Sequence, residues 1–433
     1  MSLRRMYLLQ LMLLCFCCLM LLPVAFSARV LAYNDPITIT SQTDAVHFPA
    51  YIDFTMSAND SVSPITQATI YIAYKELPNA TPVEHTVTIS RPARFVSLRW
   101  HEDTGGDNFH YAGTPVEYYW VLQDSLNHQY TESPQDFTVL DTRFSWQHLS
   151  QGLLQVNWYK RPLSFGQILL AKAQTSLTHI SQVLGGGLLH PINLWVYAND
   201  LDFHGALAPG AYEWVGGEAH PQLNEAFISV TDSEDDTLVR DMPHEMTHLI
   251  FHQLIGQGQL PPTWFDEGLA VYNQFYHEPE MNFRFNQALA SHTLLRLDTI
   301  TNGFPADAQK AYLAYGESWN LVDYMYSTFG EAKMALLIQK MNSYTAFDQD
   351  LTQALGEDQV HLENQWRLHL NQPPILGPDE ITPTPKPLAQ ASIPQSTLTD
   401  NTAPVLLTLG GLLIVLPMIG IVAILVYQRR SRA

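Results

Sequence analysis

The chain has 433 residues, of which 46% are hydrophobic, and it carries 42 acidic against 22 basic side chains. A chain of this length can bury enough apolar core for two domains. All of the acidic residues but only 16 of the basic ones lie in residues 33–403, which gives that segment a formal charge of −26. Such an acidic surface repels phosphate backbones, so we expect no nucleic-acid partner.

The N-terminus carries Arg4 and Arg5, followed by a nearly unbroken apolar run from Met6 to Phe26. This pattern in residues 1–28 is typical of a secretory signal peptide, with an uncleaved signal anchor as the alternative. All three cysteines lie inside the run, at positions 15, 17 and 18. We therefore expect neither a disulfide framework nor a cysteine metal site after it.

Residues 33–141 contain short runs that alternate in polarity or are rich in β-branched side chains, with turn residues between them. The clearest of these runs are Tyr51–Met56, Ala68–Tyr74, Phe95–Trp100, Val116–Gln123 and Gln135–Leu140. Their spacing predicts an all-β domain, an antiparallel sandwich of immunoglobulin-like type. The pattern leaves open whether this domain presents a substrate or binds a partner.

Residues 142–371 mix the two periodicities, which predicts an α+β domain after the β-sandwich. Gly210–His220 is glycine-rich and predicts a loop over a cleft. Strands are expected at Pro191–Ala198 and Asn224–Thr231. Helices are expected at Phe165–Leu184, Ser318–Phe329, Glu331–Met341 and Val360–Leu370.

Residues 244–248 read His-Glu-Met-Thr-His. Two histidines four apart lie on one face of a helix, so His244 and His248 can reach the same metal ion. Glu245 lies beside them, where a carboxylate can take a proton from metal-bound water. We expect Pro243 to be the first helical residue, with Asp241 favouring the helix N-terminus from just outside it.

A third ligand must come from another element. His252 lies two helical turns beyond His244, about 12 Å along the axis, which is too far for the same ion; we expect it near the site or on the surface. Glu267 follows His248 after 18 residues that include Gly256, Gly258 and two prolines. This spacing allows a loop and a second helix, although Glu267 could instead simply stabilise the start of that helix. A His-His-Glu set leaves the fourth position of a zinc ion open for water, unlike a closed structural site.

The motif HEMTH, the 18-residue spacing and the segment WFDEGLAVY resemble the gluzincin metallopeptidases, in particular the aminopeptidase N group and the peptidase-MA-like proteins. The resemblance covers residues 142–372. It implies a zincin-like fold with one Zn²⁺ per chain, bound by His244, His248 and Glu267. It also implies hydrolysis of peptide or protein substrates by zinc-activated water, with Glu245 as the general base.

The chain departs from related patterns at several positions. The Gly-Ala-Met-Glu-Asn-like motif of true aminopeptidases is reduced to a faint echo at residues 216–219, so exopeptidase specificity is not supported. Val271 stands where thermolysin-type enzymes have an aspartate. Phe251 and Leu254 stand where metzincins have a glycine and a third histidine.

The resemblance also suggests residues that would assist the reaction. The run Ala311–Tyr324 is similar to the tyrosine-bearing helix of these enzymes, so Tyr315 is the preferred donor to the oxyanion and Tyr312 the alternative. In gluzincins an edge strand pairs with the substrate backbone, and Asn224–Thr231 is the strand expected in that role, with an ordinary sheet strand as the alternative.

The C-terminal part predicts a membrane anchor. Residues 372–404 are rich in proline and threonine, which predicts an extended stalk. Residues 405–427 are apolar over a length that spans a bilayer, and the basic tail 428–433 favours a cytoplasmic C-terminus. We therefore expect a single-pass protein of the cell membrane with its large domain outside. The alternative function is a catalytically inactive surface-binding or adhesion protein built on the same scaffold; the oligomeric state stays open.

Overall fold

The computed structural model describes residues 36–76, 79–211, 216–231, 235–256, 258 and 260–375. The predicted signal segment, transmembrane helix and cytoplasmic tail lie outside these residues, as does the stalk after residue 375. A search of the described helices finds none with the length and apolarity needed to cross a bilayer. The membrane anchor therefore stays a prediction from sequence.

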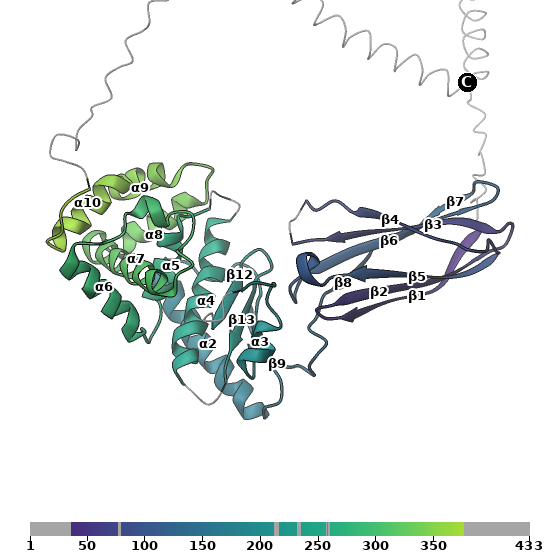
Figure 1. The fold of residues 1–433 in the computed structure, drawn as a ribbon, viewed down its shortest axis with the longest axis horizontal. Coiled ribbons are helices and arrows are strands. Elements are labelled where there is room, and N and C mark those ends of the chain that lie inside the picture. The colour runs from purple at the N-terminus through teal and green to yellow at the C-terminus, as the bar shows by residue number, and fades with distance from the viewer. Residues whose placement is uncertain are drawn as a thin grey trace, which may run out of the picture. The chain divides into compact units, whose positions relative to one another are not determined.

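The N-terminal part is an all-β domain of two antiparallel sheets (Figure 1). One sheet has the order β1-β2-β5; the other has the order β4-β3-β6-β7, and β8 also pairs with β6. On β6, Val116, Tyr118, Trp120 and Leu122 alternate inward and are buried, as the sequence pattern predicted. The elements are β1 (Ile37–His47), β2 (Tyr51–Asp60), β3 (Ile65–Tyr74), β4 (Val83–Val87), β5 (Phe95–Asp103), the 3-10 turn η1 (Gly106–Asn108), β6 (Pro115–Asp124), β7 (Gln129–Thr131) and β8 (Gln135–Thr138).

A third sheet follows the two sheets of the β-domain, with the strand order β12-β13-β11-β10-β9. The three central strands β13, β11 and β10 are parallel, and the two edge strands are antiparallel to their neighbours. Its strands are β9 (Gln147–Gln151), β10 (Leu154–Trp158), β11 (Ile192–Tyr197), β12 (Gly217–His220) and β13 (Glu225–Ser229).

Strand order corrects two sequence expectations. The segment 224–231 forms β13, but β13 lies between β12 and β11 and is not the edge strand. The edge is β12, which occupies the last four residues of the predicted loop 210–220. Four residues that include glycine, glutamate and histidine carry no strand signal, so β12 forms because it pairs with β13 and not from its own propensity.

The third sheet is covered on both faces. Leu194 and Val196 of β11 belong to one core with the helices, whereas Trp195 and Tyr197 of the same strand belong to the core of the β-domain. This alternation follows from the period of two along a strand. Most of the helices therefore pack on one face of the sheet, whereas the β-domain and the short helix α3 (Asp200–His204), which carries Phe203, lie on the other.

Helices α2 and α3 lie between strands of the third sheet, and the helices from α4 onward follow the last strand, in accord with the predicted order of a β-domain and then a mainly helical half (Figure 1). They are α2 (Leu163–Leu184), α3 (Asp200–His204), α4 (Asp235–Ile255), α5 (Thr263–Tyr272), α6 (Pro279–Ser291), the 3-10 turn η2 (Leu297–Ile300), α7 (Ala308–Phe329), α8 (Glu331–Met341), α9 (Phe347–Leu355) and α10 (Gln359–His369).

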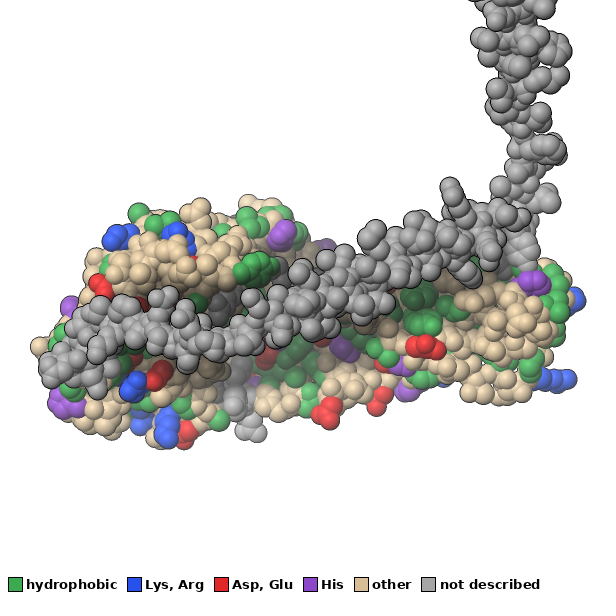
Figure 2. All heavy atoms as spheres, turned by 90° about the horizontal axis from the view of Figure 1, so that it is seen from above, with side chains coloured by type: hydrophobic (Ala, Val, Ile, Leu, Met, Phe, Trp, Pro, Cys, Tyr) green, Lys and Arg blue, Asp and Glu red, His purple; other side chains and the backbone are tan. Residues whose placement is uncertain are grey.

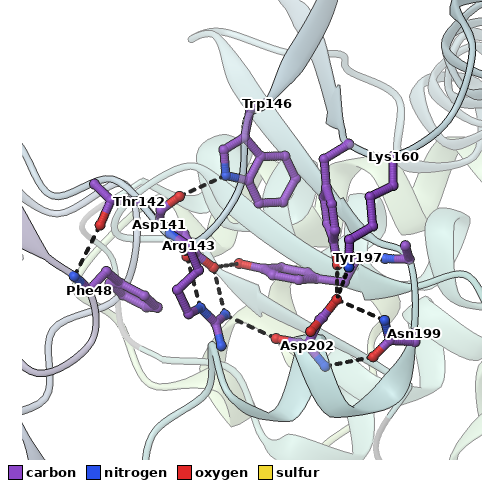
Figure 3. A network of polar contacts seen from close by, with 11 residues as sticks. Phe48, Asp141, Thr142, Arg143, Trp146, Lys160, Tyr197, Asn199 and Asp202 are labelled. Carbon is purple, nitrogen blue, oxygen red and sulfur yellow. Dashed lines mark hydrogen bonds and ion pairs between the residues drawn. The ribbon is translucent and has the colours of Figure 1, made fainter.

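The junction between the β-domain and the third sheet is a polar network around the buried Asp141 (Figure 3). The carboxylate of Asp141, which is 1% exposed, accepts hydrogen bonds from Arg143 at 2.9 and 2.6 Å and from the Tyr197 hydroxyl at 3.0 Å. Arg143 also donates to the Asp202 carbonyl at 3.0 Å. The predicted boundary at residue 141 thus falls at a closely bonded junction, and the described residues lie in one compact unit.

On the face seen in Figure 2, acidic, basic and histidine side chains are interspersed among uncharged ones. Lysine and arginine side chains do not gather into one patch on the visible part of this face. A dispersed arrangement of this kind suits solubility better than the binding of a polyanion.

Candidate metal centre

The helix that carries HEMTH, α4, is longer than the sequence indicated. Pro243 lies inside it and not at its first position, and Asp241 is likewise inside. A proline at this position cannot donate to the carbonyl of Val239, four residues earlier. That carbonyl instead accepts from the backbone N–H groups of Phe275 and Tyr276, at 2.8 and 3.2 Å. The proline therefore frees an acceptor that binds the segment after α5 to α4.

The second helix of the site, α5, begins after Pro262 and carries Glu267. Its neighbour Gly268 lies against α7, where an added Cβ would come within 2.6 Å of the Ser318 carbonyl oxygen. Only glycine permits this close approach of two helix backbones. Because α7 carries Tyr315, the contact brings the tyrosine close to the metal-binding residues.

The structure brings the three predicted ligands together from α4 and α5. His244 Nε2 lies 3.3 Å from His248 Nε2 and 3.3 Å from Glu267 Oε2, and the third separation, from His248 Nε2 to Glu267 Oε2, is 3.7 Å. A tetrahedral zinc ion with ligand bonds of about 2.0–2.1 Å holds its ligand atoms roughly 3.3–3.4 Å apart. The buried Glu267 Oε2 also has no hydrogen-bond partner. The residues thus fit a zinc ion.

Both histidines are oriented through their other ring nitrogen. His248 Nδ1 lies 2.7 Å from Asp266 Oδ1, and His244 Nδ1 lies 2.8 Å from the Gln274 side-chain amide. When Nε2 binds a metal, Nδ1 carries the proton and donates it. Asp266 is a ready acceptor, and Gln274 becomes one when its amide turns to present the oxygen, since nitrogen and oxygen of such an amide are interchangeable in shape.

His252 contacts the candidate ligand His248 only indirectly, through Asp266. Its Nε2 lies 2.7 Å from Asp266 Oδ2, so one carboxylate bridges His248 and His252. This agrees with the expectation that His252 lies near the metal-binding residues without being one of them. The bridge engages both oxygens of the Asp266 carboxylate, whose side chain is 17% exposed, and this fixes the direction in which it faces His248.

Charge at the site favours a divalent cation. Burial opposes ionisation of Glu267, but the adjacent His248 and His244 lower the pKa of Glu267 to about 2. Burial also opposes ionisation of Asp266, yet its contacts with His248 and His252 hold the pKa of Asp266 well below its usual range. Two ionised carboxylates next to two imidazoles leave negative charge that a zinc ion would compensate.

Glu245 faces the same site but is not one of the three clustered ligands. It is 6% exposed, and burial raises the pKa of Glu245 to about 7 even though His244 and His248 lower it. A carboxyl group with a pKa near neutrality can both accept and return a proton. It borders a cavity of about 110 Å³ that Gly216, Gly217 and Tyr315 also line.

The two candidate tyrosines differ in their surroundings. The Tyr315 ring lies 6.3 Å from the His244 ring, and burial raises the pKa of Tyr315 well above its ordinary value, so its phenol stays protonated. Tyr312 lines the same cavity, and burial together with the nearby Glu278 raises the pKa of Tyr312. Of the two, Tyr315 has the ring contact with His244, and its role as the donor stays a prediction.

Sequence reasoning missed Asp266, Gln274 and the edge strand β12. The first had a signal, an aspartate directly before the proposed ligand Glu267 on the same helix. Gln274 had none, because it reaches His244 only through the fastening of its segment to Val239. The faint echo at residues 216–219 does lie at the site, since Gly216 and Gly217 line the cavity.

Comparisons with known proteins agree with this geometry. Residues 172–372 match the profile of the Peptidase MA superfamily, a range that contains every residue of the site. No curated protein matches the chain. A solved M1 zinc metallopeptidase from Deinococcus radiodurans is similar at 12% identity and a TM-score of 0.33, covering 77% of this chain and 92% of that one. An aminopeptidase N family protein from Idiomarina loihiensis is similar at 9% identity and a TM-score of 0.33, covering 77% and 73%.

Because these TM-scores are low, the similarity to a family rests on the sequence profile and on the residues of the site, and not on the solved structures. The profile spans α4, α5 and α7, the three helices that carry the two histidines, Glu267 and Tyr315. Residues 172–372 are thus similar to the peptidase MA superfamily, and they contain the His-His-Glu arrangement of the candidate metal site.

Proposed function

We propose that the protein is a zinc-dependent metallopeptidase that hydrolyses peptide bonds. The observation that carries this proposal is the triangle formed by His244, His248 and Glu267, with the Glu245 carboxyl group beside it in one cavity. Within the described ranges no fourth histidine, cysteine or carboxylate joins the group. A structural zinc site would use such a fourth protein ligand, whereas a catalytic one keeps that position for water or substrate.

Zinc, when bound by His244, His248 and Glu267, supplies a Lewis acid that activates water and polarises the scissile carbonyl. Glu245 takes a proton from the attacking water and then gives it to the leaving amine, so that one water is consumed for each peptide bond broken. Tyr315 donates a hydrogen bond to the negative charge that develops on the carbonyl oxygen. Asp266 and Gln274 hold the two imidazoles in the tautomer that faces the site.

The substrate would lie along β12. This strand is at the edge of the sheet and lines the cavity through Gly216 and Gly217. An edge strand has unpaired backbone groups, which can bind an extended peptide as an additional strand. The edge role that the sequence suggested for residues 224–231 thus passes to residues 217–220, and the substrate is a peptide or an extended segment of a protein.

We also propose that the protein is anchored in the cell membrane with this domain outside. The support is the sequence of residues 405–427 and of the basic tail, together with the apolar N-terminal run. Extraction of membranes with alkaline carbonate tests the anchor, which predicts that the full chain stays in the membrane pellet. Addition of protease to intact cells tests the orientation, and survival of the catalytic domain would refute an outward-facing one.

Cleavage of a mixed peptide library by the full chain, followed by mass spectrometry, tests the enzymatic function. The Glu245→Gln variant serves as the control, because it keeps the shape of the side chain and removes the base. We expect cleavage by the wild type alone, with zinc content equal in the two proteins. Cut positions separate internal from terminal attack. Absence of cleavage by both proteins would favour the surface-binding alternative.

A further inference from the structure

The edge strand β12 contacts the catalytic helix with one of its faces. A Cβ placed on Gly217 would lie 2.7 Å from Glu245 Oε1, and one placed on Gly216 would lie 2.8 Å from Asp241 Oδ2. The backbone of β12 therefore packs directly on the side chains of α4, with no side chain of its own between them. A small movement of this strand would change the width of the cavity that both elements line.

The opposite face of β12 contacts the β-domain through Glu218 and His220. The Tyr111 hydroxyl donates to Glu218 Oε1 at 2.8 Å, and His220 Nε2 lies 2.9 Å from the same oxygen. The rings of Tyr111 and His220 are stacked at an angle with centroids 3.7 Å apart. Burial opposes ionisation of Glu218, but His220 and Tyr111 lower the pKa of Glu218, so the carboxylate that accepts the Tyr111 hydrogen bond is charged. Alternation along the strand puts these two side chains opposite Gly217.

Among the described residues, the edge strand has backbone pairing on one side only. Its four residues pair only with β13, from Gly217 opposite Ile228 to His220 opposite Glu225. A short edge strand with ladder bonds on one side is the least constrained part of a sheet. Gly216 and Gly217 add no side-chain anchors. The contacts on the β-domain side therefore add to those with β13 and α4 in fixing the position of β12.

The segment that supplies Tyr111, residues 109–114, itself packs closely on the third sheet. Gly113 adopts a left-handed backbone (φ +94°) and approaches β13 so closely that an added Cβ would lie 2.6 Å from the Glu225 side chain. Its N–H donates to the Val139 carbonyl at 2.8 Å. Glu225 is in turn hydrogen-bonded by Asn193 at 2.9 Å and by Trp195. Tyr111 is thus presented to β12 from a fixed position.

We propose that Tyr111 of the β-domain is a positioning residue for the peptidase site, which acts by holding β12 against α4. The hydroxyl fixes Glu218, and Glu218 fixes the strand along which the substrate backbone binds. This inference rests on the proposed function, and it gives the β-domain a part in substrate binding without any contact between that domain and the substrate. The residues that perform the chemistry lie on α4, α5 and α7, so a displaced β12 weakens binding more than turnover.

The test compares two single-atom changes in the full chain. Tyr111→Phe removes the hydroxyl and keeps the ring that stacks on His220. The matched control is Tyr118→Phe, which removes a buried hydroxyl of the same domain that donates to Asp44 at 3.4 Å, far from β12 in the fold. The substrate is a fluorogenic peptide built on a sequence that the wild type cuts in the peptide library.

We expect Tyr111→Phe to raise KM by about tenfold and to change kcat by less than about twofold, since correct placement of a bound substrate can be worth a factor of this size. Zinc content should equal that of the wild type. Hydrogen exchange of the backbone amides at residues 216–220 should become about threefold faster or more, because the strand opens more often. Tyr118→Phe should change none of these quantities.

The outcomes separate the two proposals. Equal KM and equal exchange at residues 216–220 in the two variants would overturn the role of Tyr111. A fall in kcat with unchanged KM and reduced zinc content would also overturn it, because that pattern reports general loss of folded protein. If the wild type cuts no peptide, the proposed function fails, and the exchange measurement alone then decides whether Tyr111 holds β12.

Discussion

Asp266 offers the sharpest test of how the site holds its metal. It is not a proposed ligand, yet its carboxylate lies 2.7 Å from both His248 Nδ1 and His252 Nε2. The change Asp266→Asn keeps the size of the side chain and removes its charge. The histidine then donates to a neutral oxygen in place of a carboxylate, which makes His248 a weaker base and a weaker ligand.

The magnitude follows from the strength of that hydrogen bond. Bonds to a charged group contribute about 1.5–3 kcal/mol in buried sites, roughly twice as much as neutral ones. The loss is therefore about 1–2 kcal/mol, which corresponds to a zinc Kd weaker by about 5- to 30-fold. The Asp266 side chain is only 17% exposed, so salt screens its charge less than that of a surface group and the effect should largely persist at high salt.

An equilibrium titration with a competing fluorescent chelator measures this Kd at neutral pH. Circular dichroism of each protein shows whether the fold is intact. The control is Asp298→Asn, which removes an exposed carboxylate paired with Arg296 at 2.8 Å on the surface. A Kd for Asp266→Asn within twofold of both the wild type and this control would refute the argument that Asp266 supports His248.

Three further changes test other parts of the molecule. Glu267→Ala should lower zinc content sharply, and normal occupancy by metal analysis would point to a different third ligand. Tyr315→Phe should lower kcat more than it raises KM, because the hydroxyl is expected to act only when charge develops on the oxygen; wild-type rates would transfer that role to Tyr312. Burial raises the pKa of Glu317 from its ordinary value of 4.5 to about 8. Between these two pH values Glu317 is ionised in the unfolded chain but keeps its proton in the folded protein, so the stability of the fold falls as pH rises. Glu317→Gln should therefore raise the free energy of unfolding by on the order of 3 kcal/mol at pH 8 and by little at pH 4, as denaturant titrations at the two pH values would measure.

The parts of the fold that sequence predicted are those encoded locally. Alternation along residues 116–122 and the four-residue spacing of His244 and His248 each follow from the geometry of one strand or one helix. The spacing to Glu267 placed a second helix after a break, and α5 begins at residue 263 as that spacing requires. In each case the residues that form the pattern are neighbours in the chain.

The parts that sequence missed depend on contacts between distant segments. Pro243 has the preference of a first helical residue, but the helix continues before it because the segment after α5 satisfies the Val239 carbonyl. Residues 217–220 become a strand only when β13 is beside them. Neither segment shows in its own sequence that β12 is the edge strand and β13 an interior one, because the pattern of a strand does not determine which strands lie beside it.

The third sheet explains why the β-domain and the helical half are not independent modules. Its far face presents Trp195, Tyr197 and Phe227, which are at most 6% exposed and belong to the same core as the side chains of the β-domain. Part of this cover comes from the β-domain, as where Tyr111 lies against Phe227, and part from the neighbouring residues Trp146 and Phe203. Removal of the β-domain would therefore open one side of this core to water. The same sheet presents the cavity at its edge strand, so the surface that the β-domain stabilises and the surface along which a substrate would bind are two sides of one element.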